Sequence, residues 1–296
     1  MGQGRNGPEM SNDWLILRAG NLQLELAPEV GGSIARFRSG DQPLLRPAAH
    51  GASDPGEMAN FPLVPFSNRV RGGNFLCDGR RIRLSPNLPG DPSPLHGQGW
   101  RHAWQVDAAS ESAATLSFLH EPGEWPWRYE TRQQFALDDR GLAITLSCRN
   151  LSPERMPCAL ALHPYFPCDR ATRLETGVTD VWLIDNLVLP TERVPATGKY
   201  LPSNGPVCGR GLDHGYEGWS GEAIIDWGRG ARLRMTAPCP RFQLYAPAAG
   251  GLFVAEPVEN ANAAHNLPQE DWRGAGIEML EMGEEKSLIA RLDVLA

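Results

Sequence analysis

Two residues of this chain combine an ionisable side chain with surroundings that could tune its affinity for a proton. His163 ends the apolar run 159–162 and precedes the stiff aromatic turn Pro-Tyr-Phe-Pro, a setting that would hold an imidazole rigidly. Glu256 ends the apolar run 251–255, which is the kind of desolvated position that a general base needs. A partly buried structural histidine and a strand-end glutamate in water are the ordinary alternatives.

Three further loops carry groups that could hold a polar ligand. His96 lies in a His-Gly-Gln-Gly stretch, whose glycines would let a ligand approach the backbone closely. Asp213 could bind the hydroxyl groups of a sugar while a ring such as that of Trp219 stacks on the apolar face of the sugar. Arg69 offers forked donors to neighbouring hydroxyls. An exposed turn histidine, turn capping and a surface ion pair would explain the same residues without a ligand.

Short strands must position these loops. Alternation of apolar and polar residues, which is typical of half-buried strands, recurs along the chain between Gly, Pro, Asn and Asp turns. The segments that alternate are 22–26, 115–119, 142–146, 232–236, 242–245 and 288–294. No amphipathic helix of three turns is visible, so the pattern predicts an all-β, antiparallel sandwich or barrel.

Composition limits the classes of partner. Of 296 residues, 41% are hydrophobic, which is enough for a core, and the formal net charge of −7 argues against nucleic acid and anionic membranes. No apolar stretch approaches the length of about 20 residues that spans a bilayer, and the polar start has no signal core. We therefore expect a cytoplasmic protein. Residues 1–12 are expected to be disordered or a tag-like end, and residues 13–296 a single domain.

The six cysteines are Cys77, Cys148, Cys158, Cys168, Cys208 and Cys239. They lie far apart without a Cys-x-x-Cys pair, a pattern that suits neither a zinc site nor a disulfide-stapled secreted domain. The prediction is that they are reduced and mostly buried thiols.

Taken in order, these segments resemble the aldose 1-epimerase (galactose mutarotase) family, in the manner of a divergent bacterial member. The resemblance spans about residue 15 to the C-terminus. It rests on Asn68-Arg69-Val70, His96-Gly97, His163-Pro164-Tyr165-Phe166, Leu212-Asp213-His214, Glu256-Pro257 and the Gly283-Glu284 turn. The resemblance implies that the fold is the large antiparallel β-sandwich called a supersandwich.

The resemblance also implies an activity and the residues that perform it. An aldose 1-epimerase is an isomerase that interconverts the α and β anomers of an aldose by opening and reclosing the ring. By resemblance, Glu256 would be the general base, His163 the general acid and His96 a hydrogen-bonding stabiliser of the ring oxygen. The substrate would be bound by Arg69, Asp213, Asn68 and Trp219. The expected partner is a monosaccharide, with no cofactor and no metal, and the protein would be a monomer or homodimer.

Two features of the sequence leave the substrate open. The residues after Glu256-Pro257 differ from the Gln and Pro-Asp pattern of many members, and the stretch 216–219 resembles a divergent branch. The alternatives are a sugar-binding protein without catalysis, a polysaccharide lyase or two-carboxylate glycosidase, and a mutarotase for a phosphorylated or sulfonated sugar. The last would need a cationic pocket, which Arg69, Arg71, Arg80 and Arg81 could supply.

Overall fold

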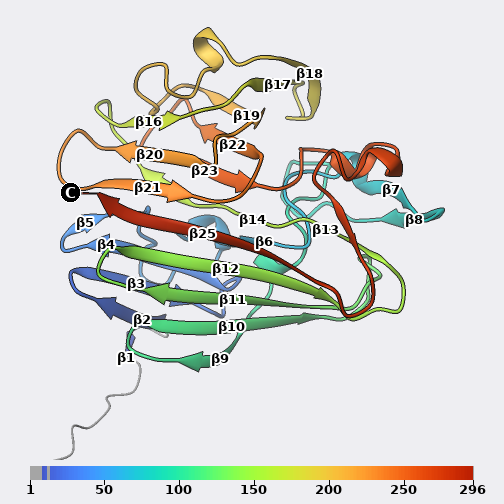
Figure 1. Ribbon diagram of the computed structural model, residues 1–296, viewed down its shortest axis with the longest axis horizontal. Helices are drawn as coiled ribbons and strands as arrows, with labels where there is room; N and C mark the ends of the chain where they lie inside the picture. Colours follow the sequence, from blue (N-terminus) through green and yellow to red (C-terminus); the bar gives the residue numbers. More distant parts are fainter. Residues whose placement is uncertain (1–8, 12–13, 296) are drawn as a thin grey trace, which may run out of the picture.

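Antiparallel strands make up nearly all of the regular structure in a computed structural model that describes residues 9–11 and 14–295 (Figure 1). The predicted all-β class and the large antiparallel sandwich are confirmed. The helical elements of the described residues are three-residue 3-10 turns. They are η1 (Pro55–Glu57), η2 (Arg71–Gly73), η3 (Gly99–Arg101), η4 (Gly198–Tyr200), η5 (Ala264–Asn266) and η6 (Gln269–Asp271).

The first large sheet has eight strands and crosses the front of the view in Figure 1. Its order is β16 (Arg173–Thr176), β20 (Glu222–Asp226), β21 (Arg232–Thr236), β25 (Glu285–Leu295), β12 (Gly141–Asn150), β11 (Tyr129–Leu137), β10 (Ala113–His120) and β9 (Gln105–Ala109). The last strand of the chain, β25, therefore lies in the middle of the sheet, between β21 and β12.

The second large sheet carries most of the chemistry described below. Its order is β18 (Pro190–Pro195), β17 (Asp180–Ile184), β19 (Leu212–Glu217), β22 (Arg241–Ala246), β23 (Leu252–Val258), β14 (Ala161–Leu162) and β6 (Pro62–Leu63), with β15 (Tyr165–Pro167) also paired to β23.

Three smaller sheets complete the fold. The N-terminal sheet has the order β1 (Glu9–Ser11), β2 (Trp14–Ala19), β3 (Leu22–Ala27), β4 (Ser33–Ser39) and β5 (Gln42–Pro43). The second is the hairpin of β7 (Asn74–Cys77) and β8 (Arg80–Arg83). The third is the pair formed by β13 (Met156–Cys158) and β24 (Glu278–Leu280).

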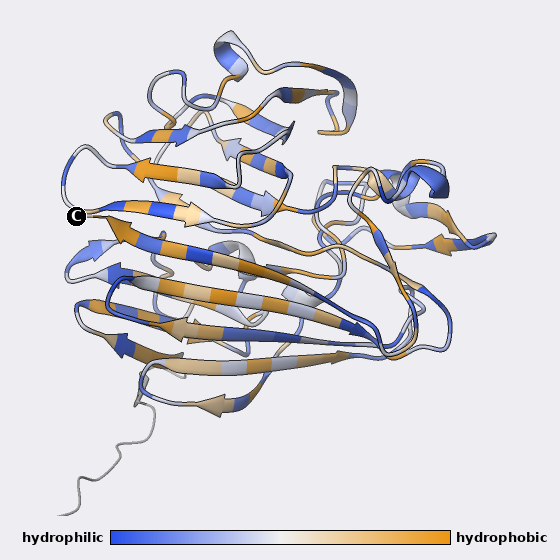
Figure 2. Cartoon of the chain, in the orientation of Figure 1, coloured by the Kyte–Doolittle hydropathy of each residue, from blue (hydrophilic) through white to orange (hydrophobic). Residues whose placement is uncertain are grey.

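One large apolar cluster lies between the sheets. Alternate residues point into it, among them Leu142, Ile144 and Leu146 of β12, and Phe242 and Leu244 of β22. The same alternation is visible as bands along the strands in Figure 2. All six alternating segments that the sequence analysis identified lie within strands β3, β10, β12, β21, β22 and β25. Burial of the apolar side chains supplies the main stabilising free energy of such strands.

A disulfide corrects the prediction for the cysteines. Cys168, directly after β15, is bonded to Cys208, which precedes β19, whereas Cys77, Cys148, Cys158 and Cys239 are free and buried. The two halves meet because the turn between β22 and β23 lies between them: Cys168 N–H donates to the Gly251 carbonyl, and Gly251 N–H contacts Cys208 Sγ at 3.2 Å.

The N-terminal segment is also corrected in part. Glu9–Ser11, which were expected to be disordered or tag-like, pair with β2 as strand β1. The rest of the segment 1–12 lies outside the described residues. Among residues 9–11 and 14–295, no helix has the length and apolarity needed to cross a membrane.

We expect the disulfide to stabilise the fold by restricting the unfolded chain. The bond spans 40 residues, and loop-closure entropy for such a span gives about 4 kcal/mol. The double variant Cys168→Ser, Cys208→Ser should therefore unfold with a free energy lower by up to about 4 kcal/mol, measured by denaturant titration. Dithiothreitol should lower the stability of the wild type toward that of the variant and leave the variant unchanged. A wild type that is indifferent to the reductant would contradict the bond.

Candidate active site

A cavity of about 310 Å³ opens over the face of the second large sheet that points away from the main core. Polar and charged side chains line its floor, and aromatic side chains line its walls. The lining residues are Asp54, Gly56, Phe61, Asn68, Arg69, Leu88, Leu95, His96, Trp100, Arg101, His163, Tyr165, Asp213, Gln243, Tyr245 and Glu256.

The alternation of the strands explains the polar floor. On β22 and β23, Phe242 and Ala255 point into the main core, so their neighbours Gln243 and Glu256 point to the opposite face. These two residues are register partners across the two strands. Asp213 reaches the same face from β19, and Gln243 Nε2 donates to its Oδ1 at 2.8 Å. Rigid adjacent strands thus hold two carboxyl groups and an amide together.

His163 lies beside Glu256 in the cavity. It follows β14, and its backbone N–H donates to the Phe61 carbonyl at 3.1 Å. Its ring stacks on Phe61 with 4.4 Å between ring centroids, and the ring of Tyr165 is 4.8 Å away. These contacts place His163 Nε2 3.5 Å from Glu256 Oε1. Glu256 Oε2 is buried and has no hydrogen-bond partner among the described residues.

His96 is held in a defined tautomer by its loop. The residue has a φ of +64° and is followed by Gly97 at +69°, where a Cβ would lie 2.1 Å from the Val64 carbonyl oxygen, so only glycine fits. The backbone N–H of Asn68 donates to His96 Nδ1 at 3.1 Å. Because Nδ1 accepts a hydrogen bond, the proton of the neutral ring is on Nε2. His96 therefore presents a donor to a ligand.

Arg69 brings positive charge to the cavity. Its Nε forms an ion pair with Asp91 Oδ2 at 2.8 Å, and both side chains are largely buried. The Arg69 charge opposes the rise in the pKa of both Glu256 and Asp213. The guanidinium, which lines the cavity, is thus placed to favour carboxylate forms on its floor.

Burial favours the uncharged forms of Glu256, His163 and His96. Desolvation raises the pKa of Glu256 well above its ordinary value, and the nearby Asp213 charge raises it further. Desolvation lowers the pKa of His163 to about 3 and that of His96 well below its usual range. The pKa of Asp213 is also raised, chiefly by burial. Groups with pKa values shifted in opposite directions, in contact and lining a cavity, are typical of acid and base catalysis.

The structure brings together six of the seven residues that the sequence analysis selected. Glu256, His163, His96, Arg69, Asp213 and Asn68 all line this cavity. Trp219 is a correction, because its ring stacks on Phe242 at 5.2 Å on the core side of β22, and its Nε1 donates to Thr176 Oγ1. It lies in the main core and is not among the lining residues.

The aromatic wall of the cavity and part of its floor were not predicted from the sequence. Phe61, Trp100 and Tyr165 replace Trp219 as rings beside the cavity. The missed floor residues, Gln243 and Tyr245, lie in a segment whose alternation had been recognised, and their opposition to Phe242 and Leu244 was the signal that could have identified them.

Of the four arginines proposed to form an anion pocket, Arg69 alone lines the cavity. Arg71, Arg80 and Arg81 do not line the cavity, and all three are exposed, Arg71 donating to the Pro190 carbonyl. Arg101 lines the rim instead, with its guanidinium over the Trp100 ring at 4.6 Å.

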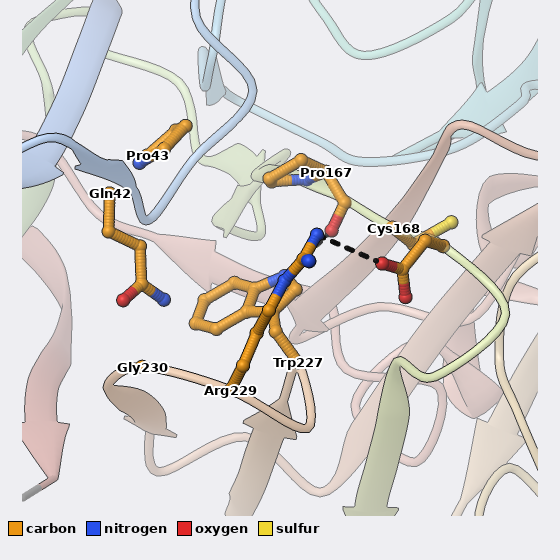
Figure 3. Close-up of a pocket in the computed structure, with 8 residues that line it drawn as sticks. Gln42, Pro43, Pro167, Cys168, Trp227, Arg229 and Gly230 are labelled. Atoms are coloured by element: carbon orange, nitrogen blue, oxygen red, sulfur yellow. Dashed lines mark hydrogen bonds and ion pairs between the residues drawn. The ribbon is translucent and has the colours of Figure 1, made fainter.

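A second hollow lies apart from these groups, beside the disulfide (Figure 3). Its surface is mostly apolar, with Pro43, Pro167 and Trp227 among its lining. Its charged groups, Arg229 and Asp169, form an exposed ion pair at 3.6 Å. It contains no buried acid or base, so it offers no comparable chemistry. Within the described part of the chain, no group of three or more His, Cys, Asp or Glu side chains is arranged to hold a metal ion.

Comparisons with known proteins agree on one family. The sequence profile described as aldose 1-epimerase matches residues 16–292. The Escherichia coli K12 protein YphB is 33% identical over 267 residues, covering 86% of this chain and 90% of YphB. A crystal structure of a proposed aldose 1-epimerase from E. coli K12 has a TM-score of 0.88 at 30% identity, covering 95% of this chain and 98% of that one. A galactose mutarotase-like protein from Clostridium acetobutylicum has the same fold, with a TM-score of 0.86 at 18% identity over 97% of both chains.

The raised pKa of Glu256 predicts that this residue destabilises the folded protein. The folded state binds the Glu256 proton more tightly than the unfolded chain, so its contribution to the free energy of unfolding falls as pH rises above the ordinary pKa of 4.5. Glu256→Gln carries no charge and should raise the free energy of unfolding at neutral pH, with a gain in Tm of about 2 °C per kcal/mol. Thermal unfolding of both proteins checks this.

A contrasting control is Asp138→Asn. The Asp138 carboxylate lies 2.9 Å from Arg291 Nη2 and accepts the Arg140 and Gly141 N–H groups, and these contacts lower its pKa. By the same linkage, removing this charge should lower the stability at neutral pH. The interpretation of Glu256 is wrong if both substitutions destabilise the protein alike.

Proposed function

This chain belongs to the aldose 1-epimerase family, and on that premise we propose that it interconverts the α and β anomers of an uncharged aldose. The observation that carries the proposal is the contact between Glu256 and His163 in the cavity, at 3.5 Å. It supplies the two proton transfers that opening a sugar ring requires, and each is worth on the order of 10²–10⁴ in rate. Protein side chains are sufficient for both transfers.

In the proposed reaction, the Glu256 carboxylate removes the proton from the C1 hydroxyl while the His163 imidazolium donates its proton to the ring oxygen. The bond between C1 and the ring oxygen breaks, and the electron pair of the C1 oxygen forms the aldehyde. After rotation about the C1–C2 bond, the two groups reverse their roles and the ring closes on the other face. His96 donates from Nε2 to the ring oxygen, a role supported by the hydrogen bond that Asn68 N–H gives to Nδ1.

Glu256 and His163 together hold one proton throughout this cycle. Before ring opening the proton is on His163, and after it the proton is on Glu256, beside a neutral imidazole. Burial, which raises the pKa of Glu256 and lowers that of His163, favours the second form before a sugar binds. The two forms differ by an internal proton shift, so the enzyme need exchange no proton with solvent between turnovers.

The charges of the cavity favour an uncharged substrate. Three carboxyl groups line it, those of Asp54, Asp213 and Glu256, against the guanidinium groups of Arg69 and Arg101. Arg69 is already paired with Asp91. A phosphate or sulfonate would therefore enter a cavity with no surplus of positive charge, at a cost in desolvation. Asp213, Gln243 and Arg69 would instead bind sugar hydroxyls, and the ring of Trp100 or Tyr165 would cover an apolar sugar face.

A test of the activity is the anomerisation of fresh α-glucose and α-galactose, with further aldoses, followed by polarimetry or by NMR exchange. We expect the wild type to accelerate it. We expect Glu256→Gln to lower the turnover by at least about 10³-fold, while sugar still binds in calorimetry. Near-wild-type turnover by this variant would exclude Glu256 as the base.

The same samples separate the rival functions. A protein that binds sugars but accelerates anomerisation of none of them would be a binding protein. Release of reducing ends from oligosaccharides would indicate hydrolysis, with Asp213 as the second carboxyl group in the cavity.

The pH dependence of kcat/KM gives an independent check. Activity should be lost when the pair binds a second proton, and this step follows the lowered pKa of His163, about 3, instead of its ordinary value of 6.5. The acid limb of the profile should therefore lie well below pH 6.5. An acid limb at the ordinary histidine value would show that His163 titrates as an exposed group.

A further inference from the structure

Arg46 lies behind one wall of the cavity without lining it, and its contacts join two segments of that wall. Its Nη2 donates to the carbonyl of Gly56 at 2.7 Å and to that of Met58. Its guanidinium carbon lies 3.9 Å from the centre of the Tyr165 ring, and its backbone N–H donates to the Tyr165 carbonyl at 2.8 Å. One half-buried cation therefore holds residues that are more than 100 positions apart in the chain.

The first segment, residues 54–58, needs contacts with other parts of the chain to hold its position. Asp54 and Gly56 line the cavity and belong to the turn around η1, a single 3-10 turn capped by the Asp54 side chain. One such turn is not stable alone, because few backbone hydrogen bonds offset its loss of conformational entropy. Arg46 Nη2 donates to the carbonyl of Gly56 within the turn and to that of Met58 at its exit, and so fixes where the turn lies.

The second segment is next to the reacting pair. Tyr165 lines the cavity, and its ring centroid is 4.8 Å from that of His163. A guanidinium over the face of an aromatic ring is attracted to it, and more strongly when the contact is partly desolvated. That contact, with the backbone hydrogen bond beside it, orients the ring that a sugar would meet.

We propose that Arg46 is a positioning residue, which holds Tyr165 and the segment 54–58 together as one wall of the cavity and thereby sets the affinity for the sugar. It touches neither the substrate nor the reacting atoms. The role in affinity rests on the proposed function, whereas the role in ordering the wall does not.

The test compares Arg46→Met with Arg46→Lys. The methionine keeps much of the length of the side chain and loses both the charge and the donors, and the lysine keeps the charge but loses the planar fork. We expect Arg46→Met to raise KM about tenfold, with kcat changed by less than about threefold. Arg46→Lys should fall between Arg46→Met and the wild type.

Arg36 provides a matched control in the same N-terminal part of the chain. Its guanidinium also lies over an aromatic ring, that of Trp14 at 5.1 Å, and donates to a backbone carbonyl, that of Ala48. Neither of these partners lines the cavity. Arg36→Met should lower the Tm without changing KM.

A second readout does not depend on activity. Amide hydrogen exchange of residues 54–58 should become faster in Arg46→Met, and faster than in Arg36→Met, whose partners Trp14 and Ala48 touch this segment only through the apolar cluster that contains Met58. Faster exchange with an unaltered KM would overturn the role in affinity, and unaltered exchange would overturn the role in ordering the wall. If the wild type anomerises no sugar, the proposed function fails, while the exchange experiment still decides the structural role of Arg46.

Discussion

The burial of one carboxyl group determines the character of this site. Glu256 points from a central strand to the face of the sheet that the loops cover, where His163 lies 3.5 Å from one of its oxygens and the other oxygen has no partner among the described residues. A carboxylate in such a place is costly, and the cost appears as a raised pKa. On the proposed function, this destabilising group has a use, because a desolvated carboxyl group with an imidazole beside it can exchange protons readily at neutral pH.

The rest of the fold supports this arrangement by rigidity. The floor of the cavity comes from three adjacent strands, β19, β22 and β23, whose other faces are packed into the main core. At one end of these strands the disulfide joins the segment after β15 to the segment before β19, with the turn between β22 and β23 in contact with both halves. The loops that complete the cavity are fixed by local devices, such as the glycine after His96 and the fork of Arg46. Precise placement of this kind is what general acid and base catalysis requires.

Much of this could be predicted from the sequence because the responsible signals are local. The alternation within segments such as 242–245 identified the strands, and an ionisable residue at the end of an apolar run identified both Glu256 and His163. The predictions that failed concerned contacts made in three dimensions, which the local sequence does not reveal. The cysteine pair spans 40 residues and is brought together by strand pairing, which no spacing rule records. Trp219 lies in a polar, aromatic segment that suggested a ligand, yet its ring packs on Phe242 in the core. Its direction could not be predicted, because the alternation along β19 does not extend to a residue in the turn after that strand.

The most direct test of this account is the protonation state of His163 in the free protein, observed by ¹⁵N NMR of its imidazole at about pH 5.5, where an ordinary histidine is mostly charged. We expect a neutral ring, with the proton of the pair on Glu256, because burial lowers the pKa of His163 to about 3. An imidazolium at this pH that loses its proton near the ordinary value of 6.5 would contradict it.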